Sequence, residues 1–256
     1  MNPIVIIPAR LKSIRFPNKI LLDIAGLPMI EHVRRRVLLS NYVNDVYIAT
    51  CDNEIKESLE PYGANIIMTS DNHTNGTSRV AEAVNKIECN KIILVQGDEP
   101  LLLPEQLDKM TETLMNDNKS IAWNATGPIE NENELYKNSF VKCSVINSRI
   151  HHCFRQPSRF KDFENYKEKI RKVLGLIAFK KDFLIELAKL KSSSIESIES
   201  IEQMRIIEYG YKLTSVAFDK TQASINEPED LEVVLKVFRE ENEQKNLLNE
   251  VLNYRL

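Results

Sequence analysis

The run Ile4-Val5-Ile6-Ile7 leads directly into the polar loop Pro8-Ala9-Arg10-Leu11-Lys12-Ser13-Ile14-Arg15-Phe16-Pro17-Asn18-Lys19. Consecutive apolar residues of this kind are typical of a strand that is buried on both faces of a parallel sheet. In such sheets, ligands bind where the strands end. The loop gathers cationic and hydroxyl side chains, namely Arg10, Lys12, Ser13, Arg15 and Lys19. This stretch therefore predicts both a fold class and a first candidate site.

Strands and helices alternate through the rest of the first half. Apolar runs at 46–50, 64–68 and 91–95 predict further strands, and apolar residues at helical spacing predict helices between them. Pro28 and Asp52 stand where two of these helices are expected to begin, and Gly63 where one should end. The alternation predicts an α/β fold with a Rossmann-like, mostly parallel sheet and helices on both faces.

The second half has a less regular pattern. Strands are expected at 141–146, 173–179 and 213–218, and a polar stretch occupies 155–172. Helices are expected around 183–190 and from Pro228 onward, and Ser200 and Gln203 have the spacing of a capping box. The charged tail beyond Arg239 keeps one apolar stripe, which is typical of a solvated helix. A partner-binding segment is the alternative.

The composition excludes several classes of protein. A chain of 256 residues with 43% hydrophobic and 28% charged residues is typical of one globular domain with at most a small appendage. A net charge of -3 argues against nucleic acid as a partner, and no apolar run approaches the ~18 residues of a membrane span. The start of the sequence lacks the basic region of a secretory signal, and the cysteines form no CxxC pair. A cytoplasmic protein with free, buried thiols is expected.

Two further polar loops follow predicted strands. Gln96-Gly97-Asp98-Glu99-Pro100 follows the strand at 91–95, and its adjacent carboxylates suit Mg²⁺, although an ordinary turn would look the same. The segment 68–79 follows the preceding strand, and its hydroxyl and amide groups can face a nucleotide base. The basic loop at 8–19 is either a clamp for a polyphosphate or a solvated loop. Neither GxxxxGK[ST] nor GxGxxG occurs in the chain.

Taken together, these loops resemble the CMP-sugar-forming cytidylyltransferases, and in particular the members that use 3-deoxy-manno-octulosonate (Kdo). The matching segments are PARxxSxRxPxK and IxGxPMIxHV (8–33), MTSxxHxxGTxRxAEA (68–83), VQGDEPLxxP (95–104), GLxxFKKDFL (175–184), SIEQMRxxExGYK (200–212) and NEPEDLEVV (226–234). The resemblance implies a nucleotidyltransferase with a glycosyltransferase-A-like architecture. It further implies a single catalytic domain over 1–240, a central sugar-binding and dimerisation segment at about 125–180, and a C-terminal helical tail at 241–256.

The resemblance also implies a reaction and its residues. CMP would pass from CTP to a 3-deoxy-ulosonic acid, Kdo by default, with release of pyrophosphate, for lipopolysaccharide or capsule synthesis. The partners implied are CTP, an acidic sugar, Mg²⁺ and a second copy of the chain. The implied catalytic residues are Arg10, Lys19 and Asp98, and the implied metal ligands are Asp98 and Asn226. Nucleotide binding falls on Pro8, Ala9, Arg10, Ser13, Arg15, Lys19, Thr69, His73, Gly76 and Thr77. Sugar binding falls on Gln96, Glu202, Gln203 and Arg155, with Arg159 as the alternative to Arg155.

Two positions depart from the family pattern. Val173 stands where the family has a histidine that faces the sugar acid, and valine cannot donate a hydrogen bond. Asn226 replaces the second metal-binding aspartate and offers only a neutral oxygen, although Glu227 is adjacent. Val173 favours a related acidic sugar, such as an amino-Kdo or a nonulosonic acid. Asn226 favours a homologue that binds nucleotide without activity.

Overall fold

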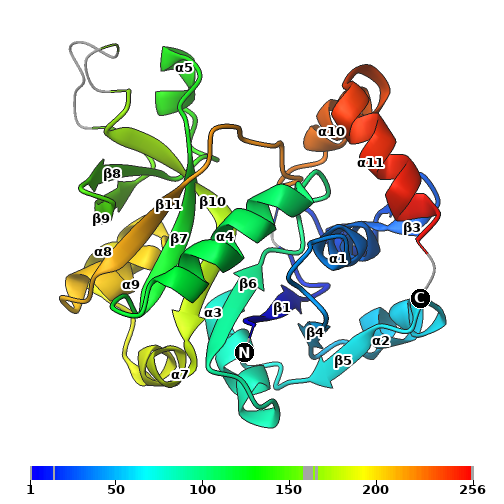
Figure 1. The fold of residues 1–256 in the computed structure, drawn as a ribbon, viewed down its shortest axis with the longest axis horizontal. Helices are drawn as coiled ribbons and strands as arrows, with labels where there is room; N and C mark the ends of the chain where they lie inside the picture. The colour runs from blue at the N-terminus through cyan, green and yellow to red at the C-terminus, as the bar shows by residue number, and fades with distance from the viewer. Residues whose placement is uncertain (1, 14, 158–163, 165–166, 255–256) are drawn as a thin grey trace. The chain divides into compact units, whose positions relative to one another are not determined.

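The computed structural model describes residues 2–13, 15–157, 164 and 167–254 (Figure 1). The chain divides into two compact units. The first unit consists of Met1–Thr111 together with Gln222–Leu256, and the second consists of Glu112–Thr221. The first unit is therefore assembled from both ends of the chain.

A parallel sheet in the order β5-β4-β1-β6 forms the centre of the first unit. Its strands are β1 (Ile4–Ala9), β4 (Val46–Thr50), β5 (Asn65–Met68) and β6 (Lys91–Val95). The helices α1 (Met29–Leu38), α2 (Asn53–Leu59) and α3 (Gly76–Ala83) pack against these strands. Val5, Ile6 and Ile7 have no exposed surface, as expected for a strand covered on both faces. Parallel pairing brings the carboxyl ends of these strands, and the polar loops that follow them, to one edge of the sheet.

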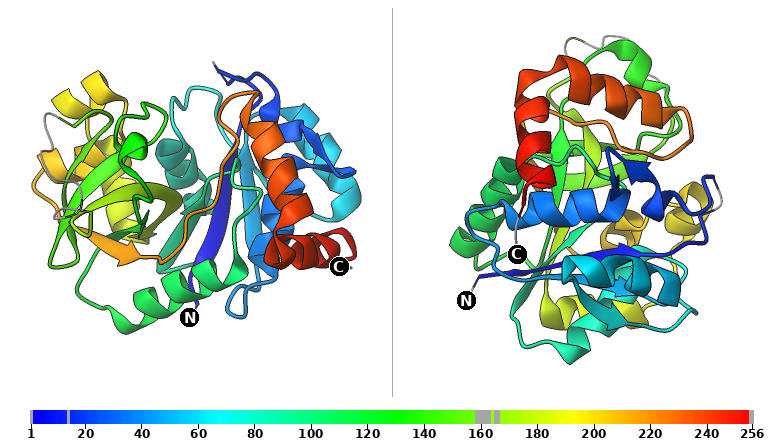
Figure 2. Two further views of the ribbon diagram at one scale, coloured as in Figure 1. Left: turned by 90° about the horizontal axis from the view of Figure 1, so that it is seen from above. Right: turned by 90° about the vertical axis from the view of Figure 1, so that its right-hand side faces the viewer.

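The end of the chain completes the first unit with α10 (Asp230–Glu240) and α11 (Asn242–Leu252), which lie beside α1 (Figure 2). Arg36 NH1 donates to Gln244 Oε1 at 2.9 Å, and Arg35 NH1 donates to the carbonyl of Val251 at 2.8 Å. Gln244 and Val251 are both fully buried. The charged tail thus packs as a helix against α1.

His32 of α1 is fully buried beside Phe238 of α10, with 6.1 Å between the ring centroids. Its Nε2 donates to the carbonyl of Ile24 at 2.5 Å, and among the described residues no group meets Nδ1. Burial lowers the pKa of His32 to about 4, although the hydrogen bond to Ile24 opposes the shift. His32 is therefore neutral in the folded protein near pH 7.

Stability is expected to fall when the pH drops below the ordinary histidine value of 6.5, because the unfolded chain then takes up a proton that folded His32 resists. The loss develops between pH 6.5 and about 4 and reaches about 3 kcal/mol. Urea unfolding at pH 4 to 7 measures it. His32→Gln keeps a donor for Ile24 and should show the weaker dependence on pH. If the free energy of unfolding depended on pH equally in the two proteins, His32 would not be the group responsible.

The second unit mixes parallel and antiparallel pairing. β7 (Ala122–Gly127) pairs parallel with β11 (Leu213–Ala217) and antiparallel with β10 (Ile170–Lys180). The hairpin of β8 (Lys142–Ile146) and β9 (Arg149–Phe154) is joined to the other strands by β9–β11 and β8–β10 pairing. The helices of this unit are α5 (Glu132–Leu135), α7 (Lys181–Lys189), α8 (Ser194–Glu199) and α9 (Gln203–Glu208).

Three further elements lie outside these sets. β2 (Asp23–Ile24) and β3 (Leu27–Pro28) pair antiparallel in the first unit, and α4 (Pro104–Asn116) spans the boundary between the two units in the sequence.

The structure confirms the expected α/β class and corrects details of the second half. Strands β7 and β9 were not predicted, and β10 begins at Ile170, inside the stretch expected to be polar. The capping box expected at Ser200 and Gln203 was wrong. The box begins at Ser193, whose backbone N–H donates to Glu196 at 3.0 Å, while Ser200 ends α8 in the left-handed conformation (φ 55°). In the described part of the chain, no helix combines the length and apolar character that a bilayer span needs.

Candidate functional site

A lysine and a carboxylate meet at the carboxyl ends of β1 and β6. Lys19 Nζ lies 2.6 Å from Asp98 Oδ2 and donates to the carbonyl of Ile225 at 2.7 Å. The N–H of Ile225 donates in turn to the carbonyl of Asp98 at 3.0 Å. The basic loop, the loop after β6 and the segment before α10 therefore converge on this ion pair.

Asn226 and Arg15 lie next to it. Arg15 NH2 donates to Asn226 Oδ1 at 3.2 Å, and Asn226 Nδ2 donates to Ser224 Oγ at 2.9 Å. The Asn226 N–H is bound by Asp230 Oδ2 at 2.8 Å, which fixes the backbone of the segment. The side-chain oxygen of Asn226 thus faces the basic loop.

Asp98 and Asn226 supply oxygen atoms that suit a hard cation. Among the described residues, no group of three or more His, Cys, Asp or Glu side chains could hold a metal ion. Mg²⁺ is usually held by one or two protein carboxylates together with water and substrate phosphates. The donor set here therefore fits Mg²⁺ that arrives with a nucleoside triphosphate better than a metal held by the protein alone.

The loop after β5 lies against the basic loop. Arg10 NH1 donates to the carbonyl of Thr74 at 3.2 Å. A Cβ atom at Gly76 would lie 3.0 Å from Pro8 Cγ and 3.7 Å from Gln96 Nε2. Glycine at position 76 therefore allows this loop to approach the ends of β1 and β6 closely.

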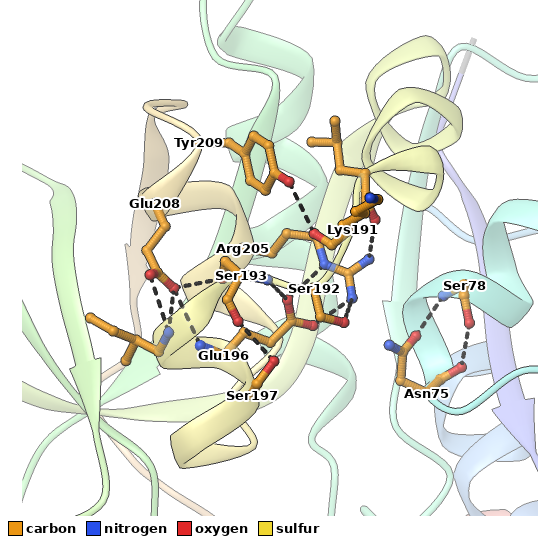
Figure 3. A network of polar contacts seen from close by, with 12 residues as sticks. Asn75, Ser78, Lys191, Ser192, Ser193, Glu196, Ser197, Arg205, Glu208 and Tyr209 are labelled. Carbon is orange, nitrogen blue, oxygen red and sulfur yellow. Dashed lines mark hydrogen bonds and ion pairs between the residues drawn. The ribbon is translucent and has the colours of Figure 1, made fainter.

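Side chains within that loop are bound to one another. His73 Nδ1 lies 3.1 Å from Ser78 Oγ, and His73 Nε2 lies 2.5 Å from Glu82 Oε2. Asn75 Oδ1 caps α3 by accepting from the N–H of Ser78 at 2.8 Å (Figure 3). Burial raises the pKa of Glu82. Hydrogen bonds from His73 and the Ser70 amide, together with nearby positive charge, outweigh this effect and hold that pKa below its usual range.

The other nucleotide residues predicted from the sequence lie on the same loops or in the elements next to them. Pro8 and Ala9 end β1, and Ser13 Oγ accepts from the N–H of Phe16 at 3.5 Å. Thr69 Oγ1 accepts from Arg79 at 2.6 Å, and Thr77 lies in the first turn of α3.

The sequence interpretation missed how Asp52 acts. The side chain of Asp52 makes no capping bond to α2 and instead accepts from the N–H of Leu11 at 2.8 Å. Asp52 does occupy the N-cap position of α2, as expected, but its carboxylate holds the start of the basic loop in place of a capping bond. No local pattern signals a contact between residues 41 positions apart.

Of the predicted sugar residues, Gln96 follows β6 in the first unit, whereas Arg155, Glu202 and Gln203 belong to the second. The guanidinium of Arg155 donates to the carbonyls of Asn138, Glu199 and Ser200 at 2.8, 2.9 and 3.3 Å. Gln203 Nε2 donates to Asn124 Oδ1 at 3.0 Å. Arg159 lies outside the described residues.

A buried ion pair fixes α9, the helix that carries Gln203. Arg205 Nε and NH2 donate to the two carboxylate oxygens of Glu196 at 2.8 and 2.5 Å (Figure 3). Glu208 accepts from Ser193 Oγ at 2.5 Å, which ties the end of α9 to the start of α8. Two parallel hydrogen bonds to one carboxylate restrict the orientation of the Arg205 side chain, and hence of α9, more than a single contact would.

Comparison with known proteins gives consistent results. Residues 4–218 match the family model described as Cytidylyltransferase. The 3-deoxy-manno-octulosonate cytidylyltransferase of Chlorobium limicola is 35% identical over 242 residues, which cover 93% of this chain and 98% of that protein. Its counterpart from Francisella tularensis subsp. holarctica is 35% identical over 245 residues, covering 91% and 97%.

Solved structures extend the comparison. CMP:2-keto-3-deoxy-manno-octonic acid synthetase complexed with CTP matches with a TM-score of 0.87 at 30% identity, covering 94% of this chain and 100% of that one. The inositol-1-phosphate CTP transferase from T. maritima matches with a TM-score of 0.66 at 13% identity, covering 100% and 98%, and so shares the fold.

Proposed function

Because the chain belongs to the cytidylyltransferase family, we propose that it transfers CMP from CTP to the anomeric hydroxyl of a 3-deoxy-ulosonic acid, with Kdo as the first candidate. The observation that carries this proposal is the Lys19–Asp98 pair, 2.6 Å apart where β1 and β6 end. It places a cation and a carboxylate at the sheet edge where α/β folds bind nucleotides.

The proposed reaction makes one bond and breaks one. The sugar hydroxyl oxygen bonds to the α-phosphorus of CTP, the bond from that phosphorus to the bridging oxygen breaks, and pyrophosphate leaves. The hydroxyl proton passes to water. Arg10, Arg15 and Lys19 would bind the phosphate oxygens and stabilise the charge that grows on the leaving group. Lys19 is suited to this role because two oxygen atoms already hold its ammonium group.

We further propose that Asp98 and Asn226 hold Mg²⁺ together with phosphate oxygens of CTP. The metal would neutralise phosphate charge and so reduce the repulsion met by the incoming oxygen. Asn226 contributes less than an aspartate would, because its oxygen is neutral and already accepts from Arg15.

Asn226→Asp should therefore lower the Mg²⁺ concentration required for half-maximal activity several-fold, by roughly the factor that an added ligand charge gives. The check is a Mg²⁺ titration of pyrophosphate release. Asn249→Asp makes the same change on the exposed side of α11 and is the matched control. Superimposable titrations of wild type and Asn226→Asp would contradict Asn226 as a ligand.

Val173 favours a second candidate substrate for the same chemistry. It is half-buried on β10 opposite Thr126, where its side chain offers no hydrogen bond to a sugar acid. An amino-Kdo or a nonulosonic acid is the alternative acceptor. For either sugar, we propose that Arg155, Glu202 and Gln203 of the second unit bind the acid, and the product would serve lipopolysaccharide or capsule synthesis.

The deciding experiment is pyrophosphate release with CTP, Mg²⁺ and a panel of acidic sugars. Release with Kdo supports the first candidate and shows that valine is tolerated at position 173. Release with another acid alone supports the second candidate. If none of the acids supports release, the proposed function is contradicted.

We also propose that the enzyme is a cytoplasmic homodimer. Cys51, Cys89, Cys143 and Cys153 form no disulfide bond, which suits a reducing compartment. Light scattering of the purified protein tests the assembly, and a monomeric mass would contradict the dimer.

A further inference from the structure

Helix α3 holds the loop after β5 through two side chains. The Glu82 carboxylate accepts from the N–H of Ser70 at 3.1 and 3.2 Å. Arg79, which is 2% exposed, donates from NH1 to Thr69 Oγ1 at 2.6 Å and to the carbonyl of Ser70 at 3.2 Å. The N–H and the C=O of Ser70 are thus both bound from one helix, which fixes the chain where it leaves β5.

Glu82, on helix α3, is also hydrogen-bonded to His73 of the loop. An ionised carboxylate only accepts hydrogen bonds, so His73 Nε2 carries a proton toward Glu82 over 2.5 Å. On the other side of the ring, His73 Nδ1 lies 3.1 Å from Ser78 Oγ, which in turn donates to the carbonyl of Asn75 at 3.1 Å. Both ring nitrogens are therefore engaged within the protein, and His73 supports the loop rather than offering a nitrogen to a ligand.

The segment held in this way reaches the candidate nucleotide site. Thr74 accepts from Arg10, and Gly76 lies against Pro8. Cytosine carries an amino donor where uracil carries a carbonyl acceptor. Polar groups of the loop distinguish the two bases only if they are held in place, because a mobile group can adapt to either base.

We propose that Glu82 is a positioning residue that fixes loop 69–76 and thereby sets the preference of the site for cytidine over uridine nucleotides. The inference rests on the proposed function only in taking this loop as the part that meets the nucleoside. Glu82 does not touch the nucleotide and acts through Ser70 and His73.

The first test is calorimetric binding of CTP and of UTP to the full chain without sugar. Glu82→Gln should weaken CTP binding about tenfold, the factor expected for loss of one charge-assisted hydrogen bond. Glu82→Ala should weaken it further, and UTP binding should change little in either variant. Glu57→Gln, on the exposed side of α2, is the control and should behave as wild type. An unchanged CTP-to-UTP ratio in Glu82→Ala, or a wild type without preference, would overturn the proposal.

A second test separates positioning from general destabilisation. Because Glu82 and His73 act as one unit, Glu82→Gln combined with His73→Gln should bind CTP no more weakly than the worse single variant. If the losses of CTP affinity in the two single variants added up in the double variant, Glu82 and His73 would not act as one unit, and the proposal would be overturned. In turnover, the KM for CTP should rise while the KM for the sugar stays constant, and an equal rise in both would count against positioning.

Failure of this inference and failure of the proposed function have different signatures. A wild type that prefers CTP in calorimetry but releases no pyrophosphate with any acid contradicts the function and leaves the role of Glu82 standing. A wild type that turns over, with Glu82 variants that keep its nucleotide preference, contradicts only the role of Glu82. Should Glu82→Ala fail to fold in a thermal scan, Glu82→Gln and His73→Gln carry the test.

Discussion

Lys19→Ala is expected to lower turnover about 10²- to 10³-fold, the usual cost of removing one preorganised group that stabilises transition-state charge. Its Nζ lies 2.6 Å from Asp98 and 2.7 Å from the carbonyl of Ile225, so the cation is already held where phosphate oxygens are proposed to bind. Lys19 begins a single-turn 3₁₀ helix, Lys19–Leu21, and its side chain contributes two polar contacts and no apolar core packing, so the fold should tolerate its loss better than the chemistry does.

Rates of pyrophosphate release at saturating substrates, together with urea unfolding of the same samples, measure both effects. Lys56→Ala removes an equivalent charge from the exposed side of α2 and should leave the rate unchanged. Wild-type turnover in Lys19→Ala would contradict the phosphate-binding role. A large loss of stability would instead make Lys19 a structural residue.

Asp98→Asn is expected to lower activity about 100-fold at limiting Mg²⁺, because the substitution removes the carboxylate assigned to the metal. Activity should recover in part as Mg²⁺ is raised, since the phosphates of CTP and Asn226 still bind the ion. The same variant loses the ion pair to Lys19, but Asp98 is partly exposed, so the cost in stability should stay near 1 kcal/mol or below.

The measurement is a Mg²⁺ titration of wild type, Asp98→Asn and Asp45→Asn, the last on an exposed loop of the first unit. An equal loss at all Mg²⁺ concentrations would assign Asp98 to a role other than metal binding. An unchanged titration would contradict any role at the site.

The sequence predicted the first unit better than the second because its strands are continuous apolar runs. β7 escaped prediction because polar residues interrupt its buried apolar ones. Asn124 and Thr126 are both fully buried, and Thr126 Oγ1 lies 2.8 Å from Ser215 Oγ on β11. When buried polar side chains form hydrogen bonds to one another across strands, the sequence lacks the regular spacing of apolar residues by which a strand is recognised. β9 was missed for a related reason, since His151 and His152 lie exposed in the middle of the strand.

For the site, the rule that ligands bind at the ends of parallel strands was enough to predict that the loops around Lys19 and Asp98 would meet. The structure brings them together, and Asn226 with them. The supporting contacts of Asp52, Glu82 and the Ile225 carbonyl could not be predicted, because bonds between side chains and distant backbone depend on the tertiary path. The family resemblance contributed the substrate, which no spacing of residues specifies.

The two-segment construction of the first unit constrains the order of events during synthesis. Ile225 follows Lys19 by 206 residues, and Gln244 follows Arg36 by 208. The strands of this unit leave the ribosome well before the groups that hold its basic loop and its buried arginine. The continuous segment Glu112–Thr221 is complete before residues 222–256, which the first unit still needs, have been synthesised. Because domains complete as their residues emerge, the sheet edge that carries Lys19 and Asp98 should mature only after the second unit has been synthesised.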